Sequence, residues 1–201
     1  MTKIGDGSLY AYRVRGLGRV GVVLWLGGRG DAPDQVVASP EAAGRRRVPL
    51  FVTVRQARAY AARRGRRLAT SGADTLELAR VERRLADPGR RQVPPGLVLE
   101  AWNFFEDLAR GLDAADRLPR QTALHDSAYE KLFSGECTAW TPDEERAVLG
   151  LLRAGADLWN SGQVALPSAA DAVGPSAAGC HIHGSRGVFM PNSPSERCTR
   201  R

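Results

Sequence analysis

Metal binding is the first chemistry that the sequence suggests, at the stretch GCHIHG of residues 179–184. Cys180, His181 and His183 lie close together and Cys198 follows, so the stretch offers the ligand atoms that zinc takes. Structural zinc sites, however, usually join two close pairs across a folded loop, and adjacent Cys and His side chains seldom point at one metal. The surrounding sequence predicts no strand or helix that could orient the ligands. We therefore expect no metal site and no cofactor, and keep these four residues only as candidates.

Two further motifs have the residue types of functional sites without the required surroundings. GLGRVG at residues 16–21 spells G-x-G-x-x-G, but a dinucleotide site needs a helix after this loop, and here a strand is predicted. A glycine-rich hairpin is therefore expected. His125 and Asp126 are neighbours in a predicted helix and point about 100° apart, so we expect His125 to lie on the surface or to cap the helix.

Catalytic residues are not evident, because no serine-hydrolase, zinc-protease or phosphate-loop motif occurs. We therefore expect a protein that is not an enzyme. The alternative is an enzyme whose residues converge only in the fold. A deep pocket that holds His125 together with a carboxylate or Cys137 would support that alternative.

Charge is distributed unevenly along the chain, which has a net charge of +7 with 27 Arg and 2 Lys. Residues 1–95 carry 19 basic and 8 acidic residues, whereas residues 96–160 carry 6 basic and 12 acidic residues. This asymmetry allows a basic face for an anionic partner and an acidic face for a cationic partner. Mutual neutralisation of the two halves is the simpler interpretation.

The acidic half supplies the first candidate binding surface. Its carboxylates fall on the polar faces of predicted amphipathic helices, which is typical of a solvated face or of a face that binds a basic protein. A metal-dependent enzyme would instead place several carboxylates on one inward wall. The residues that we expect to bind a basic protein partner are Glu106, Asp107, Asp113, Asp116, Asp126 and Glu130.

Nucleic-acid binding through arginine is the alternative function. Arginine clusters commonly bind phosphate, but without specificity, and the chain has no recognised nucleic-acid-binding module. The residues that would carry this alternative are Arg45, Arg46, Arg47, Arg63, Arg64, Arg66 and Arg67.

Hydrophobic periodicity predicts the elements that must position these side chains. Alternation and β-branched runs indicate a hairpin of strands over 8–16 and 20–26, and a third strand over 48–54, with a surface loop at 30–47 between them. Helical stripes are expected at residues 54–64, 75–86, 95–112, 122–133 and 142–159. Thr53 with Gln56, Asp74 with Glu77, and Thr141 with Glu144 have the spacing of capping boxes.

These elements predict an α+β fold in which a small antiparallel N-terminal sheet packs against four or five helices. Residues 1–92 would form a basic strand-rich and helical half, residues 93–160 an acidic helical half of the same domain, and residues 161–201 a disordered tail. No apolar run is long enough to cross a membrane, and the N-terminus does not read as a secretory signal. We therefore expect a cytoplasmic protein that does not bind membranes.

The stretches TVRQARAYAARRGRRL, EAWNFFEDLARGL, YEKLF and WTPDEERAVLGLLRAG, within residues 45–160, carry a resemblance. They resemble small uncharacterised α+β proteins of high-GC bacteria, some of which are similar in style to immunity proteins of bacterial toxin systems. The resemblance implies a non-enzymatic cytoplasmic binding protein and transfers no functional residue. Together with the acidic helices, it predicts an immunity-like protein that covers a basic partner.

Overall fold

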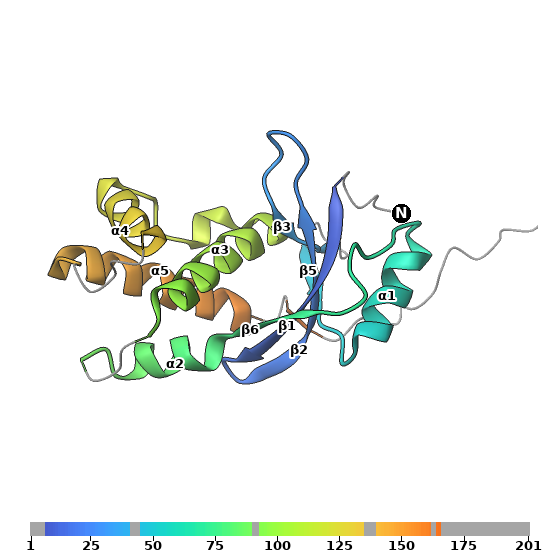
Figure 1. The fold of residues 1–201 in the computed structure, drawn as a ribbon, viewed down its shortest axis with the longest axis horizontal. Helices are drawn as coiled ribbons and strands as arrows, with labels where there is room; N and C mark the ends of the chain where they lie inside the picture. Colours follow the sequence, from blue (N-terminus) through green and yellow to red (C-terminus); the bar gives the residue numbers. More distant parts are fainter. Residues whose placement is uncertain (1–6, 41–44, 90–92, 135–139, 162–163, 166–201) are drawn as a thin grey trace, which may run out of the picture.

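The computed structural model describes residues 7–40, 45–89, 93–134, 140–161 and 164–165 of the chain. Strands from the N-terminal part lie beside helices from the C-terminal part, which confirms the predicted α+β class (Figure 1). The strands are β1 (Ser8–Gly16), β2 (Arg19–Gly27), β3 (Gln35–Val36), β4 (Ser39–Pro40), β5 (Arg46–Pro49), β6 (Asp74–Glu77) and β7 (Val164–Ala165). The helices are α1 (Val54–Arg63), α2 (Leu78–Ala86), α3 (Pro95–Leu112), α4 (Ala123–Phe133) and α5 (Pro142–Asn160), with a 3₁₀ turn η2 (Ala115–Arg117).

Strands β1 and β2 form the predicted hairpin, in which Gly16 pairs with Arg19. The two residues between them, Leu17 and Gly18, have φ values of 55° and 72°. Two consecutive positive φ angles define the type I′ turn, whose twist matches that of the flanking strands. The GLGRVG stretch is therefore a hairpin turn, as predicted.

The larger sheet has the order β3-β2-β1-β6. Its strands β1, β2 and β3 pair antiparallel, as predicted for the sheet, whereas the strand β6, which was not predicted, makes the sheet mixed. β6 runs parallel to β1 and places Asp74 beside Tyr12. The capping box predicted at Asp74 and Glu77 does not form, because α2 begins only at Leu78 and Glu77 makes no side-chain capping bond. Residues of β6 instead pair with the edge of β1, which satisfies backbone groups and buries Leu76.

Two hydrophobic cores lie on the two faces of this sheet. Side chains alternate along β2, so that Val22 and Leu24 pack with Tyr60 of α1, whereas Val23 and Trp25 pack with α3 and its neighbours. Figure 1 shows α1 on one side of the strands and α3, α4 and α5 on the other. The sheet therefore separates α1 from the other helices.

Helices α3 and α5 follow the predicted patterns. The bounds of α3 match the prediction, and Thr141 and Glu144 form the expected capping box at the start of α5. The Thr53–Gln56 box also begins α1 as predicted. Where α5 crosses α3, a Cβ on Gly155 would lie 2.2 Å from the Phe105 ring, so the close contact requires glycine.

Several local predictions were wrong. The surface loop expected at 30–47 contains β3, β4 and the start of β5, and its Val36 is fully buried beside β2. Leu124, placed on the inner stripe of its helix, is 45% exposed. Val164 belongs to the expected tail, yet it is buried in β7, which pairs with β5. The rest of the expected tail, from residue 166 onward, lies outside the described residues.

Candidate functional site: an acidic, aromatic-walled pocket

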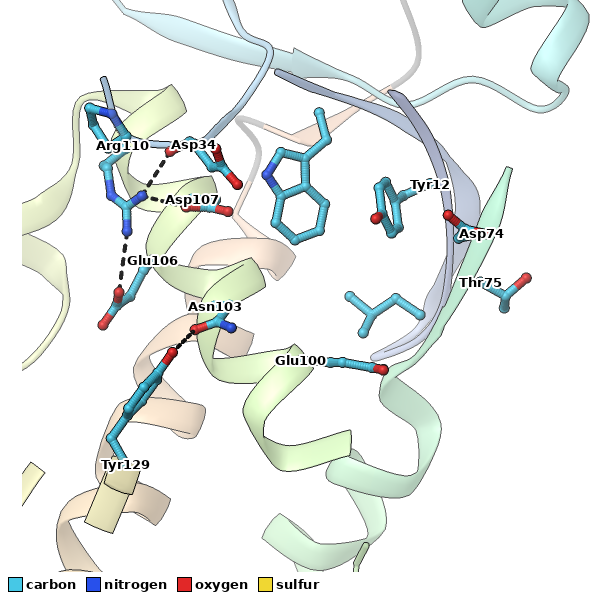
Figure 2. A pocket seen from close by; sticks show the side chains of 13 residues that line it. Tyr12, Asp34, Asp74, Thr75, Glu100, Asn103, Glu106, Asp107, Arg110 and Tyr129 are labelled. Carbon is cyan, nitrogen blue, oxygen red and sulfur yellow. Dashed lines mark hydrogen bonds and ion pairs between the residues drawn. The ribbon is translucent and has the colours of Figure 1, made fainter. Parts of the chain in front are cut away.

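A pocket of about 670 Å³ lies between the β1–β6 edge of the larger sheet and helix α3 (Figure 2). Strands β1, β2 and β6, the loop before β3, and helices α3 and α4 all contribute to its wall. Its lining residues are Tyr12, Trp25, Pro33, Asp34, Asp74, Thr75, Leu76, Glu100, Asn103, Glu106, Asp107, Arg110 and Tyr129. Five of these are carboxylic acids and one is a base, so the pocket is strongly negative at neutral pH.

Helix α3 supplies one wall through residues that recur at helical spacing: Glu100, Asn103, Asp107 and Arg110. The end of this helix lies very close to β3. A Cβ on Gly111 would lie 2.0 Å from the backbone oxygen of Val36, so only glycine permits this approach. The approach brings Arg110 within reach of the loop that precedes β3.

Arg110 organises the helix side of the pocket, as Figure 2 shows. Its guanidinium donates hydrogen bonds to the Asp34 carbonyl at 2.7 Å and to a carboxylate oxygen of Asp107. It also contacts Glu106 at 3.2 Å. Glu106 in turn accepts a hydrogen bond of 2.7 Å from the Trp102 indole. The site therefore already holds one guanidinium group, in a shell of acidic and carbonyl oxygens.

Asp107 is only 4% exposed, and burial raises its pKa to about 6 from the usual 3.8. The charges of Asp34 and Glu106 act in the same direction, whereas Arg110 opposes them. The Trp25 indole N–H also lowers the pKa, although its buried Nε1 makes no hydrogen bond of normal geometry with the described residues. Asp107 therefore changes charge close to neutral pH.

The sheet side of the pocket carries acids without a base. Asp74 and Glu100 are exposed at the pocket, and neither forms an ion pair with any residue that the structure describes. Glu100 extends from α3 toward the side on which Tyr12 and Asp74 lie (Figure 2). Burial, followed by the charges of Asp74 and Glu100, raises the pKa of Tyr12.

Aromatic rings form the base of this half of the pocket. The rings of Tyr12 and Trp25 are tilted at 56°, with centroids 4.7 Å apart, and Trp25 meets Phe104 of the core edge to face. Tyr129 donates a hydrogen bond of 3.2 Å to Asn103 on the far wall. Faces of electron-rich rings beside free carboxylates are suited to an organic cation.

The structure separates the acidic residues that were predicted to bind one partner together. Glu106 and Asp107 line the pocket, but they bind Arg110, and Asp107 is buried rather than solvated. The remaining predicted partner-binding residues are exposed outside the pocket lining: Asp113, Asp116, Asp126 and Glu130.

Several other lining residues were not predicted from the sequence. Asp34 falls in a predicted loop, Asp74 at a predicted helix cap, and Tyr12 and Trp25 in predicted strands. The acidic helical spacing from Glu100 to Asp107 was visible in the sequence. Its opposite wall was not, because that wall depends on the parallel pairing of β6 with β1.

The predicted catalytic alternative is not located at this pocket. His125 is 6% exposed and does not line the pocket, so the first of its two expected placements, on the surface, is not observed. The expected capping role is confirmed, since its Nδ1 lies 3.0 Å from the Thr122 hydroxyl in a capping box. Its ring packs edge to face on Trp102. Cys137 lies outside the described residues.

A second buried acid has a structural role. Glu144 receives hydrogen bonds from Lys131, Ser127 and Thr141, and these lower its pKa to about 2. The contacts tie α4 to the start of α5. The expectation that the helical carboxylates form a solvated face was therefore wrong for Glu144 as well as for Asp107.

The arginines predicted for nucleic-acid binding fall into two groups. Arg45, Arg46 and Arg47 lie at the start of β5, where Arg46 donates to the Gly111 carbonyl at 3.1 Å. The others lie at the end of α1 or just after it: Arg64 stacks on the Tyr60 ring at 3.6 Å, and Arg66 donates to the Gly7 carbonyl. Arg63 and Arg67 are exposed.

No group of three or more metal-binding side chains occurs among the described residues. The four candidate metal ligands, Cys180, His181, His183 and Cys198, lie outside those residues. In the described part of the chain, none of the helices combines the length and apolar character needed to span a membrane.

Comparisons with protein-family models, with curated proteins and with solved structures found no match for this chain. The functional interpretation therefore depends on the pocket and on the surfaces of the molecule.

Proposed function

We propose that this protein is a non-enzymatic, cytoplasmic binding protein similar to the immunity proteins that its sequence resembles. We further propose that it binds a basic protein partner. An Arg or Lys side chain of the partner enters the pocket and lies against Tyr12, between Asp74 and Glu100. The observation that carries this proposal is the pair of acids without a base beside an aromatic wall.

Electrostatics favours a cation at this position. Each free carboxylate contributes attraction, and the wall of the cavity excludes part of the water that would screen it. A cation over an aromatic face gains about 0.5–2 kcal/mol. The neighbouring Arg110 demonstrates the type of contact, because its guanidinium is held by Asp107, Glu106 and a carbonyl.

The acidic surface beyond the pocket supports a macromolecular partner over a small amine. Asp113 and Asp116 follow α3, and Asp126 and Glu130 lie one turn apart on α4, the helix that also supplies Tyr129 to the pocket. A small ligand would not reach these residues. A basic protein surface would, and its approach would be accelerated by their long-range attraction.

The test compares two variants that remove the same charge. Asp74→Asn with Glu100→Gln neutralises the free acids of the pocket, whereas Asp143→Asn with Asp157→Asn neutralises exposed acids of α5 that do not line it. Each is used as bait in affinity capture from the host cell, with mass spectrometry.

We expect the wild type and the α5 variant to recover the same basic protein and the pocket variant to lose it. Recovery of that partner by all three baits would overturn the proposed site. A partner that is acidic, or that is lost equally from both variants, would overturn the proposed recognition of a cation by this pocket.

A further inference from the structure

The segment that contains α1 is rich in arginine and has no acidic residue. Residues 42–73 contain nine arginines and not a single Asp or Glu. Helix α1 within this segment has no acid in its first turn and Arg63 in its last turn. Cationic charge therefore accumulates here without local neutralisation along the sequence.

Helix α1 lies across the strands from α3, the helix that lines the acidic pocket (Figure 1). Part of the charge of α1 is directed outward on that side of the sheet. Ala57, Tyr60 and Ala61 of α1 are buried against the sheet, whereas Arg55 and Arg58 are exposed one turn apart. Arg67 is exposed after the helix, beyond Gly65. None of these three arginines forms an ion pair with a residue that the structure describes.

We propose that the exposed face of α1, with Arg55, Arg58 and Arg67, is a second binding surface, which takes the phosphate backbone of a nucleic acid. This inference goes beyond the proposed function and does not depend on it. Guanidinium groups bind phosphate in a bidentate fashion and are less strongly hydrated than ammonium groups. Arg58 donates a 2.6 Å hydrogen bond to the Ser71 carbonyl, and this contact fixes the position of the Arg58 guanidinium at the surface.

A lipid surface fits this face less well. An amphipathic helix that binds membranes needs a free apolar side, and the apolar side of α1 is already packed in the core. The exposed side of α1 consists of arginine, glutamine and alanine at positions 55, 56, 58, 59, 62 and 63.

Charge attraction without base contacts implies that nucleic acids bind with little sequence preference.

The experiment measures fluorescence anisotropy of a labelled random-sequence duplex DNA of about 20 base pairs, titrated with the full chain from about 50 to 300 mM NaCl. The test variant is Arg55→Gln/Arg58→Gln/Arg67→Gln. The control, Arg120→Gln/Arg146→Gln/Arg153→Gln, removes the same charge from exposed residues on the other side of the sheet. Circular dichroism of both variants verifies that the fold is retained.

We expect the wild type and control to bind with affinity that falls steeply with salt. The test variant should bind at least about tenfold more weakly at low salt, and its logarithmic salt dependence should be shallower by about 2–3. Absence of wild-type binding at about 50 mM NaCl would overturn the proposal. Equal weakening of both variants would also overturn it, because net charge rather than α1 would then be responsible.

Discussion

The two faces of the larger sheet are covered by helices whose charged side chains differ in burial and in pairing. On the α3 side, acids and Arg110 are packed together, and Asp107 is almost completely buried. On the α1 side, Arg55 and Arg58 project from one helix into solvent. The properties of the pocket therefore depend on tertiary packing, whereas those of the α1 face depend mainly on the number of charges.

The contrast predicts different responses to substitution. A change that disturbs the contact between α3 and the sheet should alter the pocket and its ligand together. A change on the α1 face should alter binding while leaving the free energy of unfolding almost unchanged, within about 0.5 kcal/mol. Substitutions of Gly111, Arg110 and Asp107 test this contrast, and the expected change in the free energy of unfolding decreases in that order.

The largest effect is expected for Gly111→Ala. Its Cβ would meet the Val36 backbone oxygen at 2.0 Å, and backbone cannot move aside as a flexible side chain can. We expect the free energy of unfolding to fall by about 2–4 kcal/mol, measured by urea denaturation. The matched control on the α1 side is Gly65→Ala, where a φ of +70° is strained but no atom lies within 4 Å.

Gly65→Ala should cost only about 1 kcal/mol, from the left-handed backbone conformation alone. Equal losses for the two glycine variants would contradict the view that close packing of α3 on β3 maintains the pocket. Such a result would mean that backbone conformation rather than contact dominates at both positions.

A smaller loss is expected for Arg110→Ala, which leaves Asp107 and Glu106 facing each other without their shared base. Because the carboxylate of Asp107 is buried, the loss of its cation should destabilise the protein by about 1–3 kcal/mol. Added methylguanidinium chloride, at tens of millimolar, should restore part of the lost thermal stability by occupying the vacated position. Differential scanning fluorimetry measures both effects.

Two controls accompany this prediction. Sodium chloride at the same concentration should not restore the stability of Arg110→Ala. Arg146→Ala, which removes an exposed arginine paired with Asp143 on α5, should lose less than about 0.5 kcal/mol and show no response to methylguanidinium. If Arg110→Ala were also unresponsive, the acidic shell would not select a guanidinium group.

The sequence predicted the elements of both faces better than their arrangement. The hairpin, the helix α3 and the caps at Thr53 and Thr141 follow from local signals: alternation, helical periodicity and hydrogen bonds over three residues. Such signals do not depend on distant parts of the chain. They were therefore visible without the fold.

The pocket could not be predicted in the same way, because its two walls are joined by non-local pairing. Asp74 and Glu77 have the spacing of a helix capping box in the sequence. In the fold, however, Asp74 belongs to a strand that pairs with β1, and it lies beside Tyr12. Asp107 has the spacing of a solvated face, yet the packing of α3 on the sheet buries it. For α1, in contrast, exposure of Arg55 and Arg58 follows from the helical period alone.

The smallest effect, and the one of opposite sign, is expected for Asp107→Asn. Because burial raises the pKa of Asp107 from 3.8 to about 6, the folded state binds more protons than the unfolded state between these values. The stability of the wild type should therefore fall as the pH rises through this window. At about pH 7.5 the neutral variant should be more stable by about 1–2 kcal/mol, less than the full linkage value because water in the open pocket screens part of the cost.

Urea denaturation across this pH range measures the difference between Asp107→Asn and the wild type. The gain should shrink as the pH falls and vanish by about pH 3, where Asp107 is protonated in both states. Asp157→Asn, which removes an exposed acid of α5, is the matched control. A variant less stable than the wild type at every pH would show that the ion pair with Arg110 outweighs burial. A gain confined to neutral pH would instead show that the buried carboxylate is maintained at a cost in stability, as expected of a residue that serves binding. The exposed arginines of α1 carry no such cost, because they remain in water.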